Sequence, residues 1–232
     1  MASTGGSDTG ATPWPRPDLL ASLGAVLLAV TLSVALPSLI GRSLSPEIAA
    51  VLGYLAYWLP LLGVALLVRR RRWDGAHPIA WRLTPIDVLW GLGAGFLLRA
   101  IAAGIELAMR GYIAAPIMVT PWGTSDIFTL MLALVAPMLL APLVEELFFR
   151  GTLLTSLKRS GRAIGAVVLG ATIFALPHAL TSTSTTDALV RFSSAVVLGA
   201  GAGALAVSTG RVGASMIAHV AFNASLLLLL VV

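Results

Sequence analysis

The sequence predicts an all-α protein, a polytopic bundle of about seven transmembrane helices. Of its 232 residues, 58% are hydrophobic and only 11% are charged, whereas soluble domains carry about 25% charged residues. Apolar runs of about 20 residues, long enough to cross a bilayer as helices, recur along the chain. The chain has no cysteine, which excludes disulfides, thiolate metal ligands and cysteine nucleophiles.

The elements follow in order from these runs. Residues 1–17 are small, polar and proline-rich, and we expect them to form a disordered cytoplasmic tail. A signal peptide would begin with basic residues, and this stretch does not, so the next apolar run is interpreted as a retained span. The spans divide into amino-terminal transmembrane helices at 18–124 and a catalytic helical region at 125–232. Their expected positions are 19–41, 48–68, 87–108, 127–149, 163–180, 188–208 and 212–232.

Basic residues predict the orientation of the spans. Cytoplasmic loops carry an excess of lysine and arginine, and one orientation places 11 of the 15 basic residues of this chain on the inner side. We therefore expect a multi-pass protein of the cell membrane with its amino terminus in the cytoplasm and its carboxyl terminus outside. The net charge of +5 is then topological, so membrane lipid is an expected partner and nucleic acid is not. The inner residues are Arg16, Arg69, Arg70, Arg71, Arg72, Arg82, Arg150, Lys158, Arg159, Arg162 and Arg211.

Two pairs of glycines, each spaced four apart, predict close helix packing. They are Gly91 with Gly95 and Gly199 with Gly203. Small residues at this spacing let the backbones of membrane helices approach closely. We interpret both pairs as packing within one chain rather than as a dimer motif.

Ionisable residues inside spans are costly and are functional candidates by default. Arg99 and Glu106 lie seven residues apart on one helix face near the outer end of the third span, where a structural role is favoured. The remaining candidates cluster in the carboxy-terminal half of the chain. They are Glu145, Glu146, Arg150, His178 and His219, with Asn223 as a polar companion.

The two adjacent glutamates are predicted to differ. Glu146 and Arg150 have the i, i+4 spacing of an ion pair on one helix face. Glu145 is rotated by about 100° from Glu146 and is left to face a cavity. Pro137 and Pro142, which precede the pair, each remove an amide donor and loosen the helix there.

Two further pairs have helical spacing: Phe174 with His178, and His219 with Asn223. Two histidines on separate spans, together with an unpaired glutamate, favour one shared polar site. The expected depths of these residues in the membrane, counted from the basic residue at the end of each span, agree poorly. At about 1.5 Å per residue, Glu145 lies ~20 Å from Lys158 but His219 only ~12 Å from Arg211. We expect part of the segment before Lys158 to lie outside the hydrocarbon, which would reduce the difference.

The series E-E-x-x-x-R, F-x-x-x-H and H-x-x-x-N, in this order on successive helices, resembles the CPBP family of intramembrane proteases. That family includes the type II CAAX prenyl endopeptidases and bacterial Abi proteins, and the resemblance covers roughly residues 125 to 232. It implies that Glu145 is the general base that activates water and that His178 positions this water. It further implies that His219 and Asn223 stabilise the oxyanion, with Glu146 and Arg150 in support. The implied substrate is a membrane-associated peptide or protein, for which a lipidated, CAAX-like tail is one option.

The cofactor is left open by the sequence. Glu145, His178 and His219 are residue types that ligate zinc, and the family is widely labelled metalloprotease. The chain lacks the H-E-x-x-H motif of zinc peptidases. A metal-independent glutamate mechanism is therefore favoured over a divalent metal.

Three other functions were weighed against this one. Ser215 precedes His219 by one helical turn, but it lacks the glycine that follows the serine of rhomboid proteases. Buried Glu, Arg and His also serve the proton relays of carriers, although no internal repeat supports a transporter of inverted halves. A non-catalytic immunity or scaffold protein of the membrane is the third alternative.

Overall fold

Long helices follow one another along the chain, as the apolar runs predict. The computed structural model describes residues 17–40, 44–71, 79–113, 132, 134–159, 162–180, 182 and 184–228. These residues contain helices and, apart from a single bridge between Ala80 and Arg211, no strand pairing, which confirms the all-α class. The helices are α1 (Pro17–Ile40), α2 (Pro46–Arg71), α3 (Pro85–Arg110), α5 (Ala141–Phe148), α6 (Thr155–Lys158), α7 (Ala163–Leu180), α8 (Thr185–Thr209) and α9 (Gly213–Leu228).

The predicted tail lies outside the described residues except for Pro17, which is the first residue of α1. Residues 125–131, at the predicted start of the catalytic region, lie outside them as well.

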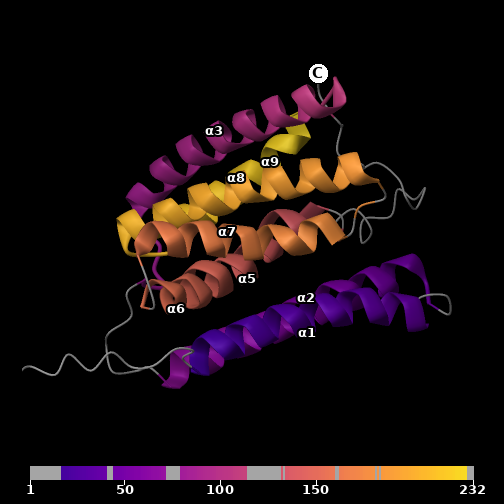
Figure 1. Ribbon diagram of the computed structural model, residues 1–232, viewed down its shortest axis with the longest axis horizontal. Coiled ribbons are helices and arrows are strands. Elements are labelled where there is room, and N and C mark those ends of the chain that lie inside the picture. Colours follow the sequence, from indigo (N-terminus) through magenta and orange to yellow (C-terminus); the bar gives the residue numbers. More distant parts are fainter. Residues whose placement is uncertain are drawn as a thin grey trace, which may run out of the picture.

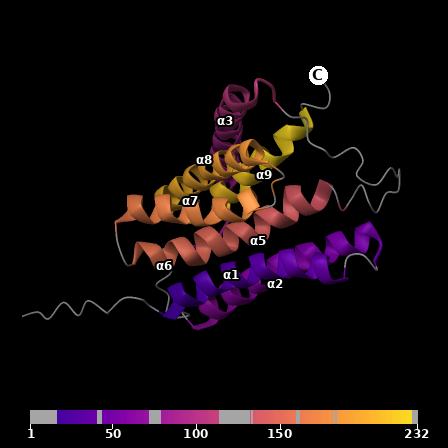
Figure 2. The ribbon, with the colours of Figure 1, turned by 45° about the vertical axis from the view of Figure 1, so that its right-hand side comes forward.

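The helices pack side by side in a layered bundle (Figure 1). α1 and α2 form a hairpin on one side, α7 packs mainly on α8, and α3 packs mainly on α9. The α5–α6 run lies between the α1–α2 hairpin and the other helices, and the turned view shows the same order (Figure 2). Residues of α5 therefore contact both halves of the chain.

Small residues make two of these interfaces close. A Cβ atom added at Gly91 would lie 2.5 Å from Ile217 Cβ, and one at Gly95 would lie 2.6 Å from the Ala218 carbonyl oxygen, both on α9. A Cβ atom at Gly199 would lie 2.9 Å from Ala171 Cα on α7. Both glycine pairs thus serve packing within the chain, as predicted.

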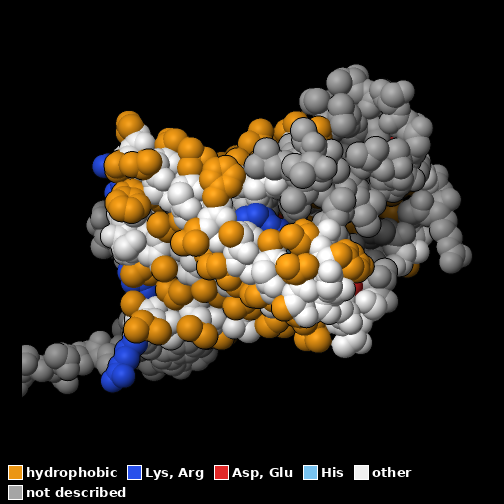
Figure 3. Space-filling view, turned by 90° about the horizontal axis from the view of Figure 1, so that it is seen from above, with side chains coloured by type: hydrophobic (Ala, Val, Ile, Leu, Met, Phe, Trp, Pro, Cys, Tyr) orange, Lys and Arg blue, Asp and Glu red, His pale blue; other side chains and the backbone are white. Residues whose placement is uncertain are grey.

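The surface has the character of a membrane protein. Within the part of the chain that the structure describes, five helices are long and apolar enough to span a bilayer: α1, most of α2, α3, α7 and α8. Large apolar side chains point outward along them, including Leu27 at 70%, Leu39 at 78% and Ile164 at 80% exposure. Most of the visible lysine and arginine side chains lie at one end of the molecule, one further basic patch lies near the middle, and hydrophobic side chains spread over much of the described face (Figure 3). The chain is a multi-pass membrane protein.

The fourth predicted span is a run of helical segments rather than one regular helix. It contains two π-helical turns, η2 (Ala136–Leu140) and η3 (Phe149–Leu154), which flank α5. At the end of η2 the Ala141 amide donates to the Ala136 carbonyl, five residues back. Pro137 directly follows the acceptor residue and Pro142 directly follows the donor residue. The missing amide donors of these two prolines are the physical reason for the irregular register.

Candidate active site

Glu146 and Arg150 form a buried ion pair beside the second π-helical turn. Arg150 Nη1 lies 2.8 Å from Glu146 Oε1, and the two side chains are 3% and 0% exposed. Arg150 Nη2 also donates to the Gly199 carbonyl at 3.3 Å, and its guanidinium lies over the Phe174 ring. A buried charge is tolerated only when it is paired and hydrogen-bonded. The i, i+4 pair predicted from the sequence is present.

His219 joins this pair from α9. Its Nδ1 lies 2.9 Å from Glu146 Oε1, the same oxygen that Arg150 contacts. Because the carboxylate accepts, Nδ1 carries the proton of this hydrogen bond. The other ring nitrogen, Nε2, lies 3.9 Å from Glu145 Oε2. This contact between His219 and Glu146 could not be predicted from the sequence, because the two residues lie 73 positions apart and no helical spacing relates them.

Glu145 is itself buried, with 6% exposure, and lies between two cavities. One cavity, of about 370 Å³, is lined by α5, α7, α8 and α9. The other, of about 390 Å³, lies between the α1–α2 hairpin and α5 with α7. The first cavity brings together most of the predicted site residues: Glu145, Phe174, His178, His219 and Asn223. The depth difference expected from helix counting therefore does not separate them.

His178 is oriented by its own helix. Its Nδ1 lies 2.9 Å from the Phe174 carbonyl oxygen. A carbonyl only accepts, so Nδ1 is the donor and Nε2 is the acceptor nitrogen of the neutral ring. The buried Phe174 ring lies 4.8 Å from the His178 ring and 5.7 Å from the His219 ring, centre to centre. One aromatic side chain thus packs against both imidazoles.

Asn223 has a structural partner that the sequence did not indicate. Its Nδ2 donates to the Pro137 carbonyl at 2.8 Å. In a regular helix the Ala141 amide would bond this carbonyl, but in the π register it bonds Ala136 instead. Pro142, the next residue that could donate, has no N–H. Asn223 therefore donates to a carbonyl that the π register and the missing N–H of Pro142 leave without a backbone donor.

Several further polar residues line the cavities and were not among the predicted site residues, among them Tyr57 and Arg191. Tyr57 of α2 lines the cavity on the hairpin side. Arg191 of α8 lines the cavity that holds both histidines. Neither belongs to a local motif, so only the packing of α2 and α8 against α5 and α7 identifies them. The α1–α2 hairpin, which lies outside the region that the sequence resemblance covers, contributes one wall of the cavity on its side.

Ser215, the residue of the rhomboid alternative, is fully buried. Its hydroxyl donates to the Val212 carbonyl at 2.9 Å. This is the ordinary arrangement of a serine that bonds the backbone of its own helix.

The proposed zinc ligands do not form a metal site in this arrangement. Within the described residues no group of three His, Asp or Glu side chains is placed to hold a metal ion. His219 Nδ1 is engaged by Glu146, which leaves only Nε2, 3.9 Å from Glu145 Oε2, to face an ion. Among the described residues, Glu145, His178 and His219 are thus not gathered as a set of three zinc ligands.

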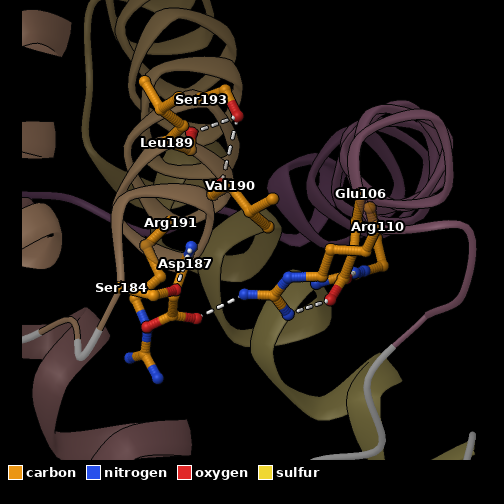
Figure 4. Close-up of polar contacts among 9 residues, drawn as sticks. Glu106, Arg110, Ser184, Asp187, Leu189, Val190, Arg191 and Ser193 are labelled. Atoms are coloured by element: carbon orange, nitrogen blue, oxygen red, sulfur yellow. Dashed lines mark hydrogen bonds and ion pairs between the residues drawn. The ribbon is translucent and has the colours of Figure 1, made fainter.

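A second charged group lies where the end of α3 meets the start of α8 (Figure 4). Arg99 and Arg110 both contact Glu106, at 3.3 and 2.8 Å. Arg110 also pairs with Asp187, whose carboxylate lies between the guanidinium groups of Arg110 and Arg191. Arg99 and Glu106, which the sequence places on one helix face, are therefore part of a longer chain of alternating charges.

The fold and the site together define a polytopic helical membrane protein with a carboxylate–imidazole centre inside the bundle. Residues 126–225 match the model of the Rce1-like family, described as type II CAAX prenyl endopeptidase Rce1-like. The match falls on the region that carries the three motifs and confirms the resemblance to type II CAAX prenyl endopeptidases. No curated protein and no solved structure matches the chain. The match supports intramembrane endopeptidase activity, the hydrolysis of peptide bonds.

Proposed function

We propose that the chain hydrolyses peptide bonds of membrane-associated substrates, with Glu145 as the general base. The observation that carries the proposal is the position of the Glu145 carboxylate, which lines both cavities. Glu146, its neighbour, is occupied by Arg150 and His219. Glu145 is thus the acidic group placed to meet a substrate and a water molecule.

The charges of the buried cluster favour this chemistry. Glu146 and Arg150 neutralise one another, so one proton shared between Glu145 and His219 keeps the remaining pair neutral. With the proton on His219, Glu145 is ionised and acts as a base, and His219 Nε2 becomes a donor towards the cavity. Fixed donors at a developing oxyanion are typically the largest electrostatic contribution to acyl transfer.

The reaction then balances within these residues. Glu145 takes a proton from water as the water oxygen bonds to the scissile carbonyl carbon, and His178 Nε2 accepts from the second hydrogen of that water. The carbonyl oxygen becomes an oxyanion, to which His219 Nε2–H donates. Glu145 passes its proton to the amide nitrogen, the C–N bond breaks, and a carboxylic acid and an amine are released.

Asn223 has a supporting role in this proposal. Its amide nitrogen is engaged by the Pro137 carbonyl, on the turn that leads into α5. It therefore positions the Glu145 segment, in addition to lining the cavity.

The hairpin-side cavity favours an apolar substrate. Its walls include Val30, Val34, Tyr54 and Trp58, with few polar groups besides Glu145 and His178. Apolar walls bury hydrocarbon at roughly 25 cal/mol per Å². A membrane-embedded peptide or a lipidated, CAAX-like tail suits such a surface.

The test compares wild-type protein with Glu145→Gln, both full-length and reconstituted in vesicles, on a library of membrane peptides read by mass spectrometry. We expect cleavage to fall by about 10²–10⁴-fold with little change in Tm. Glu106→Gln is the matched control, because it removes a buried carboxylate that pairs with Arg99 and Arg110, away from both cavities that Glu145 lines. Cleavage that survives Glu145→Gln would refute the assignment of the base. Proton-driven transport without any cleavage would identify a carrier instead.

A further inference from the structure

A third cavity lies at the basic end of the bundle, apart from the proposed active site. It has a volume of about 190 Å³, and it shares no lining residue with the two cavities that contain Glu145. Three separate segments enclose it: the end of α2, the stretch before α3, and the η3–α6 run. Its lining residues are Val68, Arg69, Ala80, Trp81, Gly151, Thr152 and Thr155.

Arg69 supplies a cation to this cavity. Its guanidinium carbon lies 4.6 Å from the centre of the Trp81 ring. A guanidinium stacked on an aromatic face keeps its five N–H donors in its own plane, where they suit the oxygens of a phosphate or carboxylate. Among the residues that the structure describes, no carboxylate pairs with Arg69.

Thr155 supplies a buried donor from α6. The residue is 3% exposed, and its hydroxyl has no hydrogen-bond partner within the described part of the chain. Buried polar groups nearly always have a partner, so an exception calls for an explanation. An acceptor oxygen in the cavity that Thr155 lines would provide that partner.

Gly151 lets the walls close on one another. A Cβ atom at this position would collide with the Trp81 indole nitrogen. Glycine therefore allows the indole edge to lie against the η3 turn and to complete the cavity. The cavity is a built feature of three segments rather than a gap beside one side chain.

The position of the cavity indicates the source of its ligand. Arg70 and Arg71, which follow Arg69 at the end of α2, are exposed, and this is the end where lysine and arginine gather (Figure 3). Tryptophan and basic residues characteristically lie at the level of lipid headgroups. We infer that this cavity binds the phosphate group of a membrane phospholipid, held by the Arg69 guanidinium and the Thr155 hydroxyl.

The test measures the Tm of the full-length, detergent-purified protein during titration with short-chain phosphatidylglycerol. The comparison arms are inorganic phosphate and a short-chain diacylglycerol, which has the same acyl chains without the phosphate. We expect the phospholipid to raise Tm by roughly 4 °C at saturation, and the two other arms to have little effect. The variants are Arg69→Gln, Thr155→Val and, as the matched control, Arg70→Gln, which removes the same charge from an exposed neighbour.

Binding at the cavity requires that the shift is lost in Arg69→Gln, weakened in Thr155→Val and kept in Arg70→Gln. An equal shift in Arg69→Gln and wild type would overturn the proposal, as would an equal shift with diacylglycerol. A full shift with inorganic phosphate alone would overturn the headgroup assignment and leave a site for soluble phosphate. If Arg69→Gln does not fold, Thr155→Val carries the same comparison, because it removes one hydroxyl and keeps the side-chain shape.

Discussion

The bundle holds two groups of charged residues that resemble one another in composition and differ in arrangement. The central group consists of Glu145, Glu146, Arg150 and His219, and the outer group of Arg99, Glu106, Arg110, Asp187 and Arg191. In the outer group each carboxylate lies between two arginines, and the last member, Arg191, is half exposed. In the central group one carboxylate is paired through a single oxygen with both Arg150 and His219, whereas the other lines two cavities.

Under the proposed function, pairing rather than the presence of charge separates the structural group from the reactive one. An acid paired with two cations has little capacity left for proton transfer. An acid that faces a cavity keeps that capacity. The sequence contains both sets of residues, and the arrangement in space distinguishes them.

The largest effect should follow from breaking the central pair. Arg150→Ala leaves Glu146 buried without its cation, and we expect the free energy of unfolding to fall by about 3–5 kcal/mol. Purified yield and thermal unfolding in detergent measure this loss, with Arg70→Ala as the exposed control. A double variant, Glu146→Gln with Arg150→Met, should recover part of the stability, because it removes both charges. Unchanged stability in Arg150→Ala would show that the pair is not structural.

A smaller loss of stability and a larger specific loss of activity should follow from His219→Phe. Phenylalanine keeps a ring beside Phe174 and lacks both nitrogens. We expect kcat to fall by about 10²–10³-fold, as for the removal of an oxyanion donor, while KM changes little. The free energy of unfolding should fall by about 1–3 kcal/mol, because Glu146 loses a hydrogen bond in the core. Full activity in this variant would remove His219 from the proposed chemistry.

The smallest effect should come from the outer group. Asp187→Asn weakens contacts with Arg110 and the half-exposed Arg191, and we expect a loss of about 1 kcal/mol or less. Thermal unfolding at low and high salt measures it, and the difference from wild type should shrink as salt screens the network. Peptide cleavage should stay within about threefold of wild type. A loss of cleavage comparable to that of Glu145→Gln would place the outer group in the active site and remove the contrast.

The sequence predicted those features of the site that depend on spacing within a single helix. The pairing of Glu146 with Arg150 depends on one helical turn, and the distinction from Glu145 depends on the rotation per residue. The prolines at 137 and 142 indicated an irregular helix. The hydrogen bond from Asn223 to the Pro137 carbonyl could not be predicted from the sequence. It depends both on the π-helical register of η2, which precedes α5, and on the position of α9.

The sequence by itself determined that this protein is a membrane bundle with an Rce1-like carboxy-terminal region. Long apolar runs, the placement of arginines and motifs within single helices carry that information, since each depends on neighbours along the chain. Only the tertiary structure decided that His219 bonds Glu146, that Glu145 joins two cavities, and that Arg69, Trp81 and Thr155 enclose a third. Contacts between residues remote in sequence depend on how whole helices tilt and pack, and no local period in the sequence specifies that geometry.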